Sequence, residues 1–174
     1  MGIAQAALVA VSSVMTAIFP LAITSEPNLS RDLIFIESVS FNMSLRDFDR
    51  SRFTLRRQQR WFDWTTDGCS APIIGDEGRS FNFSAACRRH DFGYRNLKLL
   101  DRRYNCAEIS PDSVCSVNSW SYGQYWNSQQ RIRVDEQFQR DLLDSCASRT
   151  RTFRLRCDAW AITFFHSVRA IGGP

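Results

Sequence analysis

The ten residues CRRHDFGYRN, from Cys87 to Asn96, decide more about the fold than any other part of this 174-residue chain. They place a histidine and a carboxylate side by side, three and four residues after a cysteine. Positions three and four apart share one face of a helix, so Cys87, His90, Asp91 and Tyr94 would form a single stripe. The cysteine can attach that stripe to another segment, the histidine can move protons, and the carboxylate can hold a cation. The stretch therefore predicts a helix that carries a functional site.

The segment just before this helix has the composition of a loop. Residues 61–80 contain Pro72, three glycines and the run TTDGC, which ends at Cys69. Such residue types favour turns over regular structure. Trp61 and Trp64 stand at the beginning of this loop, and we expect both of them to belong to the core.

All six cysteines lie after residue 68, and none of them forms the Cys-x-x-Cys pair that is typical of zinc sites. An even number of such cysteines indicates disulfides in an oxidising compartment, so we expect a secreted, extracellular protein. Many pairings are open, and the simplest is sequential: Cys69–Cys87, Cys106–Cys115 and Cys146–Cys157. The first of these would attach the loop to the helix.

That attachment would bring Asp67 and the Gly68 carbonyl toward Asp91. Two carboxylates and a backbone oxygen are hard ligands, which suit Ca²⁺ better than zinc or copper. They are fewer than Ca²⁺ takes, so water or a substrate oxygen would complete its shell. A cation open to substrate beside a histidine is the layout of a hydrolase. In that layout His90 takes a proton from the water that attacks an ester carbonyl.

A histidine that acts as a base needs a partner on its second ring nitrogen. A second long helix is expected from Gln129 to about Ser148, and Asp135 lies early in it. Antiparallel packing of the two helices would set Asp135 opposite His90. Glu136 and Asp141 remain rivals on local chemistry alone, and an exposed acid in the first helical turn is the alternative role for Asp135.

Helical periodicity dominates the remainder of the chain. Residues 30–60 predict one or two helices, and residues 155–168 predict a last one. Alternating β-branched residues are scarce, and 101–128 is irregular. The predicted fold is therefore all-α, a small disulfide-stapled helical bundle with two antiparallel catalytic helices and a calcium-binding loop.

The N-terminal residues differ from the rest of the chain. Residues 1–24 carry no charged side chain, and the run from Ile3 to Ile23 is mostly apolar. This pattern predicts a secretory signal peptide, followed by one catalytic domain at residues 25–174. The alternative is an uncleaved membrane anchor, because the run approaches the ~20 residues that span a bilayer.

The motifs FDWTTDGC at 62–69 and CRRHDFGYRN at 87–96 resemble the secreted phospholipase A2 family of bacteria and fungi. The resemblance covers roughly residues 30–100 and 129–168. Between them, 101–128 forms an insertion that separates the two catalytic helices by more than the family pattern implies. Its aromatic residues suit either a membrane-contacting flap or ordinary packing over the helices; they are Trp120, Tyr122, Tyr125 and Trp126.

The resemblance implies roles for individual residues. The family's calcium ligands fall on Asp67, the Gly68 carbonyl and Asp91, and its general base falls on His90. The aspartate that orients the base sits in an Arg-hydrophobic-Asp segment at the start of the next helix, which falls on Asp135. A mostly helical fold and pairings like Cys69–Cys87 and Cys146–Cys157 are implied as well.

The activity implied is calcium-dependent hydrolysis of the sn-2 ester of glycerophospholipids, which releases a fatty acid and a lysophospholipid. The substrate would be met at a phospholipid membrane or micelle surface, and we expect a monomer. The alternative is a non-enzymatic secreted binder or toxin on the same scaffold, although a pure binder has no need of a proton relay.

A cluster of basic residues lies in one short segment of the chain. Its net charge of +4 comes from 22 basic and 18 acidic residues, and five arginines lie between Arg50 and Arg60. Such a cluster can attract anionic lipid or nucleic acid. A solvated helical face is the favoured interpretation, and no nucleic-acid partner is expected because a secreted disulfide protein seldom meets one.

Overall fold

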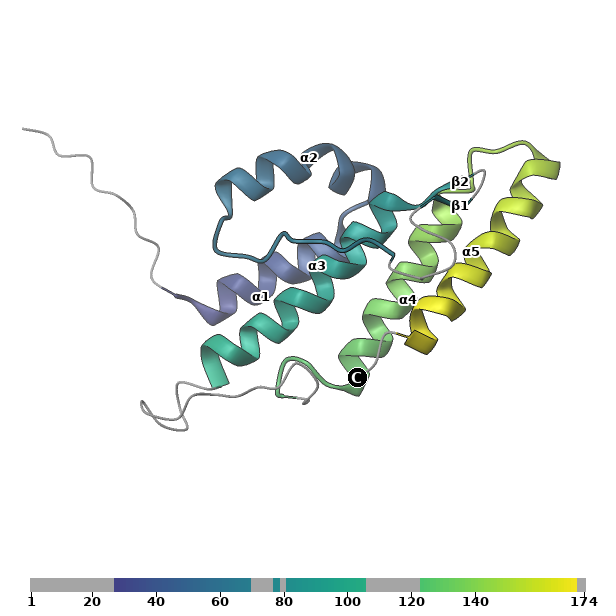
Figure 1. Ribbon diagram of the computed structural model, residues 1–174. Coiled ribbons are helices and arrows are strands. Elements are labelled where there is room, and N and C mark those ends of the chain that lie inside the picture. Colours follow the sequence, from purple (N-terminus) through teal and green to yellow (C-terminus); the bar gives the residue numbers. More distant parts are fainter. Residues whose placement is uncertain (1–26, 70–76, 79–80, 106–122, 172–174) are drawn as a thin grey trace, which may run out of the picture.

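The computed structural model describes residues 27–69, 77–78, 81–105 and 123–171 (Figure 1). The predicted signal peptide and the predicted pairing of Cys106 with Cys115 lie outside these residues. None of the helices in the described part is long and apolar enough to cross a membrane.

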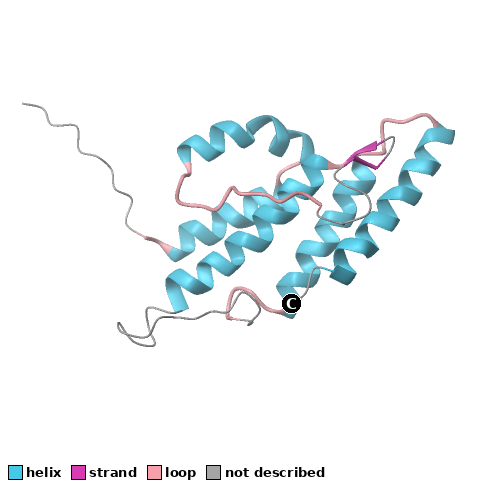
Figure 2. Cartoon of the chain, viewed as in Figure 1, coloured by secondary structure: helices cyan, strands magenta, loops and turns pink. Residues whose placement is uncertain are grey.

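Five α-helices make up most of the described residues, and two of them continue into a π-helical turn (Figure 2). In the part of the chain that the structure describes, an antiparallel pair of two-residue strands precedes the third helix. In chain order the elements are α1 (Leu29–Glu37), η1 (Ser38–Asn42), α2 (Leu45–Gln58), β1 (Glu77–Gly78), β2 (Phe81–Asn82), α3 (Ser84–Leu100), η2 (Asp101–Asn105), α4 (Ser128–Asp144) and α5 (Arg151–Ile171). The predicted helical bundle is confirmed.

Three of the helices begin at a side-chain cap. The side chains of Asn28, Ser44 and Asn127 accept hydrogen bonds from backbone N–H groups at the starts of α1, α2 and α4. Each bond satisfies one of the N–H groups that a helix leaves without a partner in its first turn. The sequence therefore fixes where these three helices start.

Helices α3 and α4 pack antiparallel, as predicted. Their contacts run in opposite directions, because His90 meets Asp135 while the earlier Arg89 meets the later Asp141. The two helices approach closely at Gly93, where an added Cβ would lie 3.2 Å from a methyl carbon of Val134. A larger residue in the middle of the motif helix would push the helices apart. Helix α5 then packs on the other side of α4 (Figure 1).

The core has two parts, one on each side of α3. The first lies between α3, α4 and α5, and it contains both described disulfides. These join Cys69 to Cys87 and Cys146 to Cys157, with Cα–Cα distances of 5.3 and 5.6 Å. Both predicted pairings are confirmed. The first disulfide holds the end of the loop against the motif helix, and the second closes the turn between α4 and α5.

The second part of the core is aromatic and lies among α1, α2 and α3. The rings of Phe35 and Phe62 stack at 4.5 Å, and Trp64 lies 4.5 Å from Phe92. Trp61 does not join them. Its side chain is 37% exposed, and the guanidinium of Arg103 covers its ring. The expectation that Trp61 is a core residue was therefore wrong.

The insertion is described only at its two ends. At its beginning, Asp101 accepts hydrogen bonds from the backbone N–H groups of Tyr125 and Trp126 at its end. Trp126 is buried, and its ring packs 4.4 Å from that of Tyr94. Ordinary packing is thus the correct interpretation for Trp126, while Trp120 and Tyr122 lie outside the described residues.

Candidate active site

A histidine and a buried carboxylate meet between α3 and α4. His90 Nε2 lies 3.0 Å from Asp135 Oδ1. Because an ionised carboxylate only accepts hydrogen bonds, the Nε2 atom carries the proton of a neutral ring, and Nδ1 is left as the basic nitrogen. The pair can therefore hold an imidazole in one tautomer and stabilise it when it gains a proton.

Aromatic neighbours fix the orientation of the histidine ring. The rings of Tyr94 and Phe138 lie 4.5 and 4.7 Å from that of His90. The His90 side chain is 10% exposed, whereas that of Asp135 is 3% exposed. The carboxylate is thus shielded from water, and the imidazole keeps a narrow opening to the outside.

Asp135 has two further neighbours, and neither of these contacts was predicted from the sequence. The Tyr94 hydroxyl donates to the same Oδ1 atom over 2.9 Å. Burial, followed by the charge of Asp135, raises the pKa of Tyr94, so the phenol remains a donor. The Arg131 guanidinium lies 3.9 Å from the other carboxylate oxygen. Arg131 precedes Asp135 by four residues and so shares its helical face, which was the signal available for finding it.

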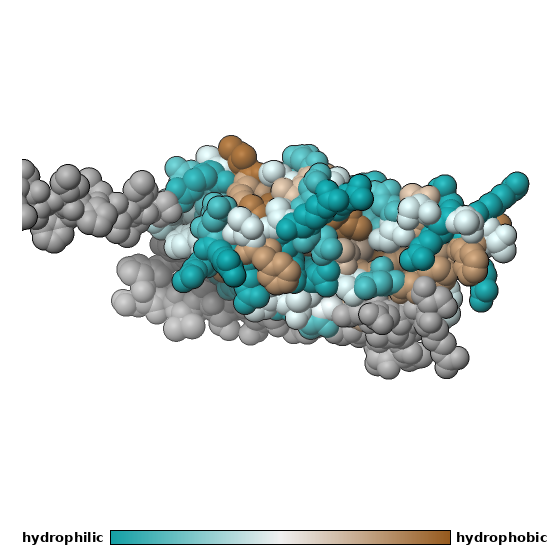
Figure 3. Space-filling model, turned by 90° about the horizontal axis from the view of Figure 1, so that it is seen from above, coloured by the Kyte–Doolittle hydropathy of each residue, from teal (hydrophilic) through white to brown (hydrophobic). Residues whose placement is uncertain are grey.

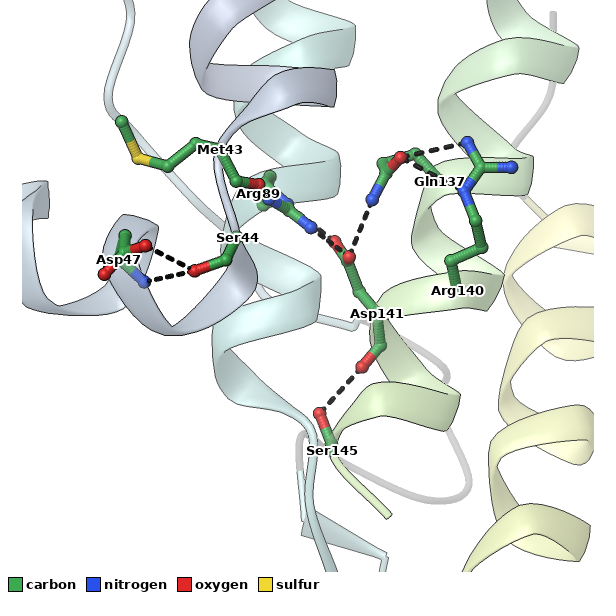
Figure 4. A network of polar contacts seen from close by, with 8 residues as sticks. All are labelled: Met43, Ser44, Asp47, Arg89, Gln137, Arg140, Asp141 and Ser145. Atoms are coloured by element: carbon green, nitrogen blue, oxygen red, sulfur yellow. Dashed lines mark hydrogen bonds and ion pairs between the residues drawn. The ribbon is translucent and has the colours of Figure 1, made fainter. Parts of the chain in front are cut away.

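The other predicted acids do not approach the histidine. Glu136 is exposed, and Asp141 forms a buried ion pair with Arg89 (Figure 4). Arg89 also donates to the carbonyl of Met43, before α2, so one side chain connects three segments. The structure thus brings Asp135, and neither of its rivals, to His90.

The loop residues lie beside Asp91, the residue that follows the histidine in the motif. The Asp91 carboxylate accepts hydrogen bonds from the Thr66 hydroxyl and from the backbone N–H of Gly68. Gly68 has a φ of 70°, a conformation that favours glycine, and this turn aims its N–H at the helix. Burial is the main cause that raises the pKa of Asp91 to about 6. The nearby charge of Asp67 contributes to the same rise.

Asp67 has a different partner in the structure. Its carboxylate accepts a hydrogen bond from Arg95 over 2.7 Å, and its side chain is 63% exposed. Among the described residues, no three or more His, Cys, Asp or Glu side chains are grouped so that they could hold a metal ion. The structure therefore places Asp67, Gly68 and Asp91 in one neighbourhood without arranging them as a finished cation cage.

The chemistry of this neighbourhood still fits a hard cation. It offers two carboxylates, whose charges repel each other, together with hydroxyl and backbone oxygens on a turn. Oxygen donors of this kind are those that Ca²⁺ takes. Thr66 and Arg95 were not predicted. Arg95 follows Asp91 by four residues, so the sequence alone indicates that the two side chains share one face of the helix.

One buried side chain positions the beginning of the loop. Asn96 accepts a hydrogen bond from the Asp63 N–H and donates to the Asp63 carbonyl, each over 2.8 Å. It also donates to the carbonyl of Phe92 within α3. Because Asn96 is fully buried, its amide holds the loop to the motif helix at Asp63, four residues before Asp67.

Comparison with known proteins gives consistent matches. Residues 36–111 match the family model described as prokaryotic phospholipase A2. A protein named secretory phospholipase A2 from Beauveria bassiana (strain ARSEF 2860) is 32% identical over 112 residues, which cover 64% of this chain and 44% of that relative. A second protein of the same name, from Arthroderma benhamiae (strain ATCC MYA-4681 / CBS 112371), is 27% identical over 135 residues. These cover 76% of this chain and 73% of that relative.

Proposed function

The chain belongs to the secreted phospholipase A2 family of bacteria and fungi, and on this premise we propose that it is a secreted calcium-dependent phospholipase A2. It would hydrolyse the sn-2 ester of glycerophospholipids at a membrane or micelle surface. The observation that carries this proposal is the 3.0 Å contact between His90 Nε2 and the buried Asp135. Such a pair supplies the positioned base that ester hydrolysis requires.

The proposed role of His90 follows from which nitrogen is engaged. With Nε2 held by Asp135, Nδ1 accepts a proton from a water molecule as that water attacks the ester carbonyl. The resulting imidazolium then gives the proton to the departing lysophospholipid oxygen. Water is the nucleophile, so no acyl-enzyme forms, and the histidine ends the cycle neutral.

Asp135 and Tyr94 would assist this proton transfer indirectly, through their contacts with His90 and with each other. Asp135 keeps the histidine in the required tautomer and stabilises the imidazolium, while Tyr94 donates to that carboxylate over 2.9 Å. Neither side chain would touch the substrate. Their contribution is to keep the base in place between the two helices.

Calcium would be held by Asp67, the Gly68 carbonyl and Asp91. When bound, it would supply charge stabilisation for the ester oxygen that becomes negative during the attack. For this, Asp67 must exchange Arg95 for the ion, and Asp91 must exchange its contacts with Thr66 and the Gly68 N–H.

The experiment that tests the function is hydrolysis of phosphatidylcholine vesicles labelled in the sn-2 acyl chain. We expect labelled fatty acid to appear with millimolar Ca²⁺, to stop with EDTA and to return when Ca²⁺ is restored. Extracellular calcium sites commonly have dissociation constants of ~10⁻⁴–10⁻³ M. Release of the sn-1 chain, or full activity after chelation, would contradict the proposal.

A matched pair of histidine variants separates catalysis from folding. The chain has two histidines, and His166 is exposed on α5. We expect His90→Ala to lose several orders of magnitude in turnover while His166→Ala stays near wild type. Lack of hydrolysis by the folded wild-type protein would instead favour a non-enzymatic binder on this scaffold.

A further inference from the structure

Positive charge is concentrated in one short part of the molecule. Residues 50–60 contain five arginines and no acidic residue, whereas the remaining 163 residues carry 17 basic and 18 acidic ones. The whole positive net charge of the protein therefore comes from this segment. We call these five side chains the arginine face; they are Arg50, Arg52, Arg56, Arg57 and Arg60.

Helix α2, which bears most of this face, is weakly covered by the rest of the protein. Of its 14 residues only Phe48 is buried. Figure 3 looks down on the side of the molecule where α2 lies, and hydrophilic residues there surround scattered hydrophobic ones. One apolar side chain on α2 is strongly exposed, because Phe53 is 63% accessible. The helix thus presents both charge and an apolar ring to solvent.

A groove lies between the end of α2 and the loop that follows. Its volume is about 560 Å³, and Phe53, Arg56, Arg57 and Arg60 line it together with Asp63 and Thr65. Asp63 is directed to its own loop, where it accepts hydrogen bonds from the backbone and the hydroxyl of Thr65. The lining of the groove therefore includes three arginines and one carboxylate, and that carboxylate already has partners.

The groove and the candidate calcium loop share one piece of chain. Thr65 lines the groove, and its neighbour Thr66 donates to Asp91 beside the catalytic histidine. Asn96 fixes Asp63 to the motif helix, so this wall of the groove does not move independently of α3. A group bound in the groove would lie next to the loop on which hydrolysis depends.

From this combination we propose that the arginine face and Phe53 form a docking surface for membranes that contain anionic phospholipids. Guanidinium groups bind phosphate oxygens through paired hydrogen bonds, which suits the headgroups of such lipids. Phe53 would enter the boundary between headgroups and acyl chains. The proposal rests on the proposed function only for the choice of lipid over other polyanions. An exposed aromatic ring among the arginines favours lipid as well, because nucleic-acid phosphates offer no apolar layer to receive it.

Binding must be measured without hydrolysis, so that docking and catalysis can fail separately. The full chain is mixed in EDTA with vesicles of ether-linked phosphatidylcholine, with or without ether-linked phosphatidylglycerol, and co-sedimentation is measured. These lipids contain no ester that the protein could cleave. We expect strong binding only when the anionic lipid is present, and we expect it to weaken as salt is raised.

Two triple variants with the same change in net charge decide where the lipid binds. The test variant carries Arg56→Glu, Arg57→Glu and Arg60→Glu; the control carries Arg149→Glu, Arg151→Glu and Arg156→Glu, three exposed arginines at or near the start of α5. Each arginine near an anionic surface is worth about a fivefold change in affinity, so loss of three of them, with three negative charges added, should weaken binding by at least about a hundredfold. The control should stay within about threefold of wild type, since its charges are not in the docking surface.

Three results of these binding measurements would contradict the proposal. Equal losses in the test and control variants would reduce the effect to net charge and overturn the proposal. Tighter binding to RNA than to anionic vesicles would overturn the choice of partner. Because glutamates disfavour a helix C-terminus, the gentler Arg56→Gln, Arg57→Gln and Arg60→Gln triple is measured as well. Unchanged binding in that variant, if folded, would also contradict the proposal.

Discussion

The two halves of the candidate active site are built in opposite ways. His90 and Asp135 lie on two packed helices, with the carboxylate 3% exposed and the pair already in contact. Asp67 lies on a loop, is 63% exposed and is paired with Arg95. The His90–Asp135 pair, which we call the relay, is therefore preorganised by the fold, whereas the proposed cation ligands would have to exchange partners before they could act together.

The difference has a physical cause. Helix packing fixes the relay because Gly93 allows close approach and Arg89 joins α3 to α4 in a buried ion pair. The loop is held by the Cys69–Cys87 disulfide, by the contacts of Asn96 with Asp63, and by polar contacts of Thr66, Asp67 and Gly68 with α3. For a cation to bind, Asp67 and Asp91 would have to exchange those polar partners for the ion. A cation site that must admit both an ion and a substrate benefits from such adjustment, while a base that must point at one water does not.

The largest effect should come from breaking the relay itself. Asp135→Asn removes the charge and offers His90 an amide, which can support the wrong ring tautomer. We expect turnover to fall on the order of 10³–10⁴-fold, as is typical when the carboxylate of such a pair is neutralised. Calcium affinity, measured by calorimetry, should remain within about twofold because Asp135 is not among the proposed ligands. Parallel loss of calcium binding would show that the two halves are not separable.

Much of the relay was accessible from the sequence. Two long amphipathic helices with antiparallel packing were enough to set Asp135 opposite His90, and the family pattern chose it over Glu136 and Asp141. The sequence did not show why Asp141 fails to pair with His90. Asp141 is unavailable because Arg89 occupies it, and that pairing depends on a tertiary contact between residues 52 positions apart.

The loop was predicted less completely. Its disulfide and its neighbourhood with Asp91 followed from the motif, but the contact between Asp67 and Arg95 did not. Local spacing showed that Arg95 shares a helical face with Asp91, yet it did not show which loop carboxylate would arrive there. The two-residue strands before α3 were also not predicted, since segments so short carry no periodicity.

Second in size is the stability that supports the relay. Arg89→Met leaves Asp141 buried without its cation, six residues after Asp135 on α4. Loss of one partner of a buried ion pair costs ~3–5 kcal/mol in the free energy of unfolding, to be measured by urea denaturation. The matched control is Arg88→Met, which breaks a partly exposed pair with Asp49 and should cost ~0–1 kcal/mol. Similar values for both variants would mean that burial does not decide the cost.

Third, the two disulfides should differ in what they support. One double variant replaces Cys69 and Cys87 by serine, and the other replaces Cys146 and Cys157. They remove cross-links between residues that are 18 and 11 positions apart in the sequence. Each double variant should lose ~3 kcal/mol of stability. Only the first should also weaken calcium binding, because it holds the loop against α3. Titration of both proteins at a temperature where they are folded makes the comparison. Equal calcium affinities would show that the other contacts of the loop suffice to hold it.

The smallest effect concerns the exchange of partners at Asp67. Arg95 competes with a cation for that carboxylate over a 2.7 Å contact, so binding an ion requires this contact to break. An exposed ion pair of this kind is worth ~0.2–1 kcal/mol, which corresponds to a gain of up to about fivefold in calcium affinity for Arg95→Gln. Lys98→Gln is the control, since it removes a positive charge three residues further along α3. A gain in both variants would trace the effect to general charge. A loss in Arg95→Gln would mean that the arginine holds Asp67 in place for the ion, and the loop would then be as preorganised as the relay.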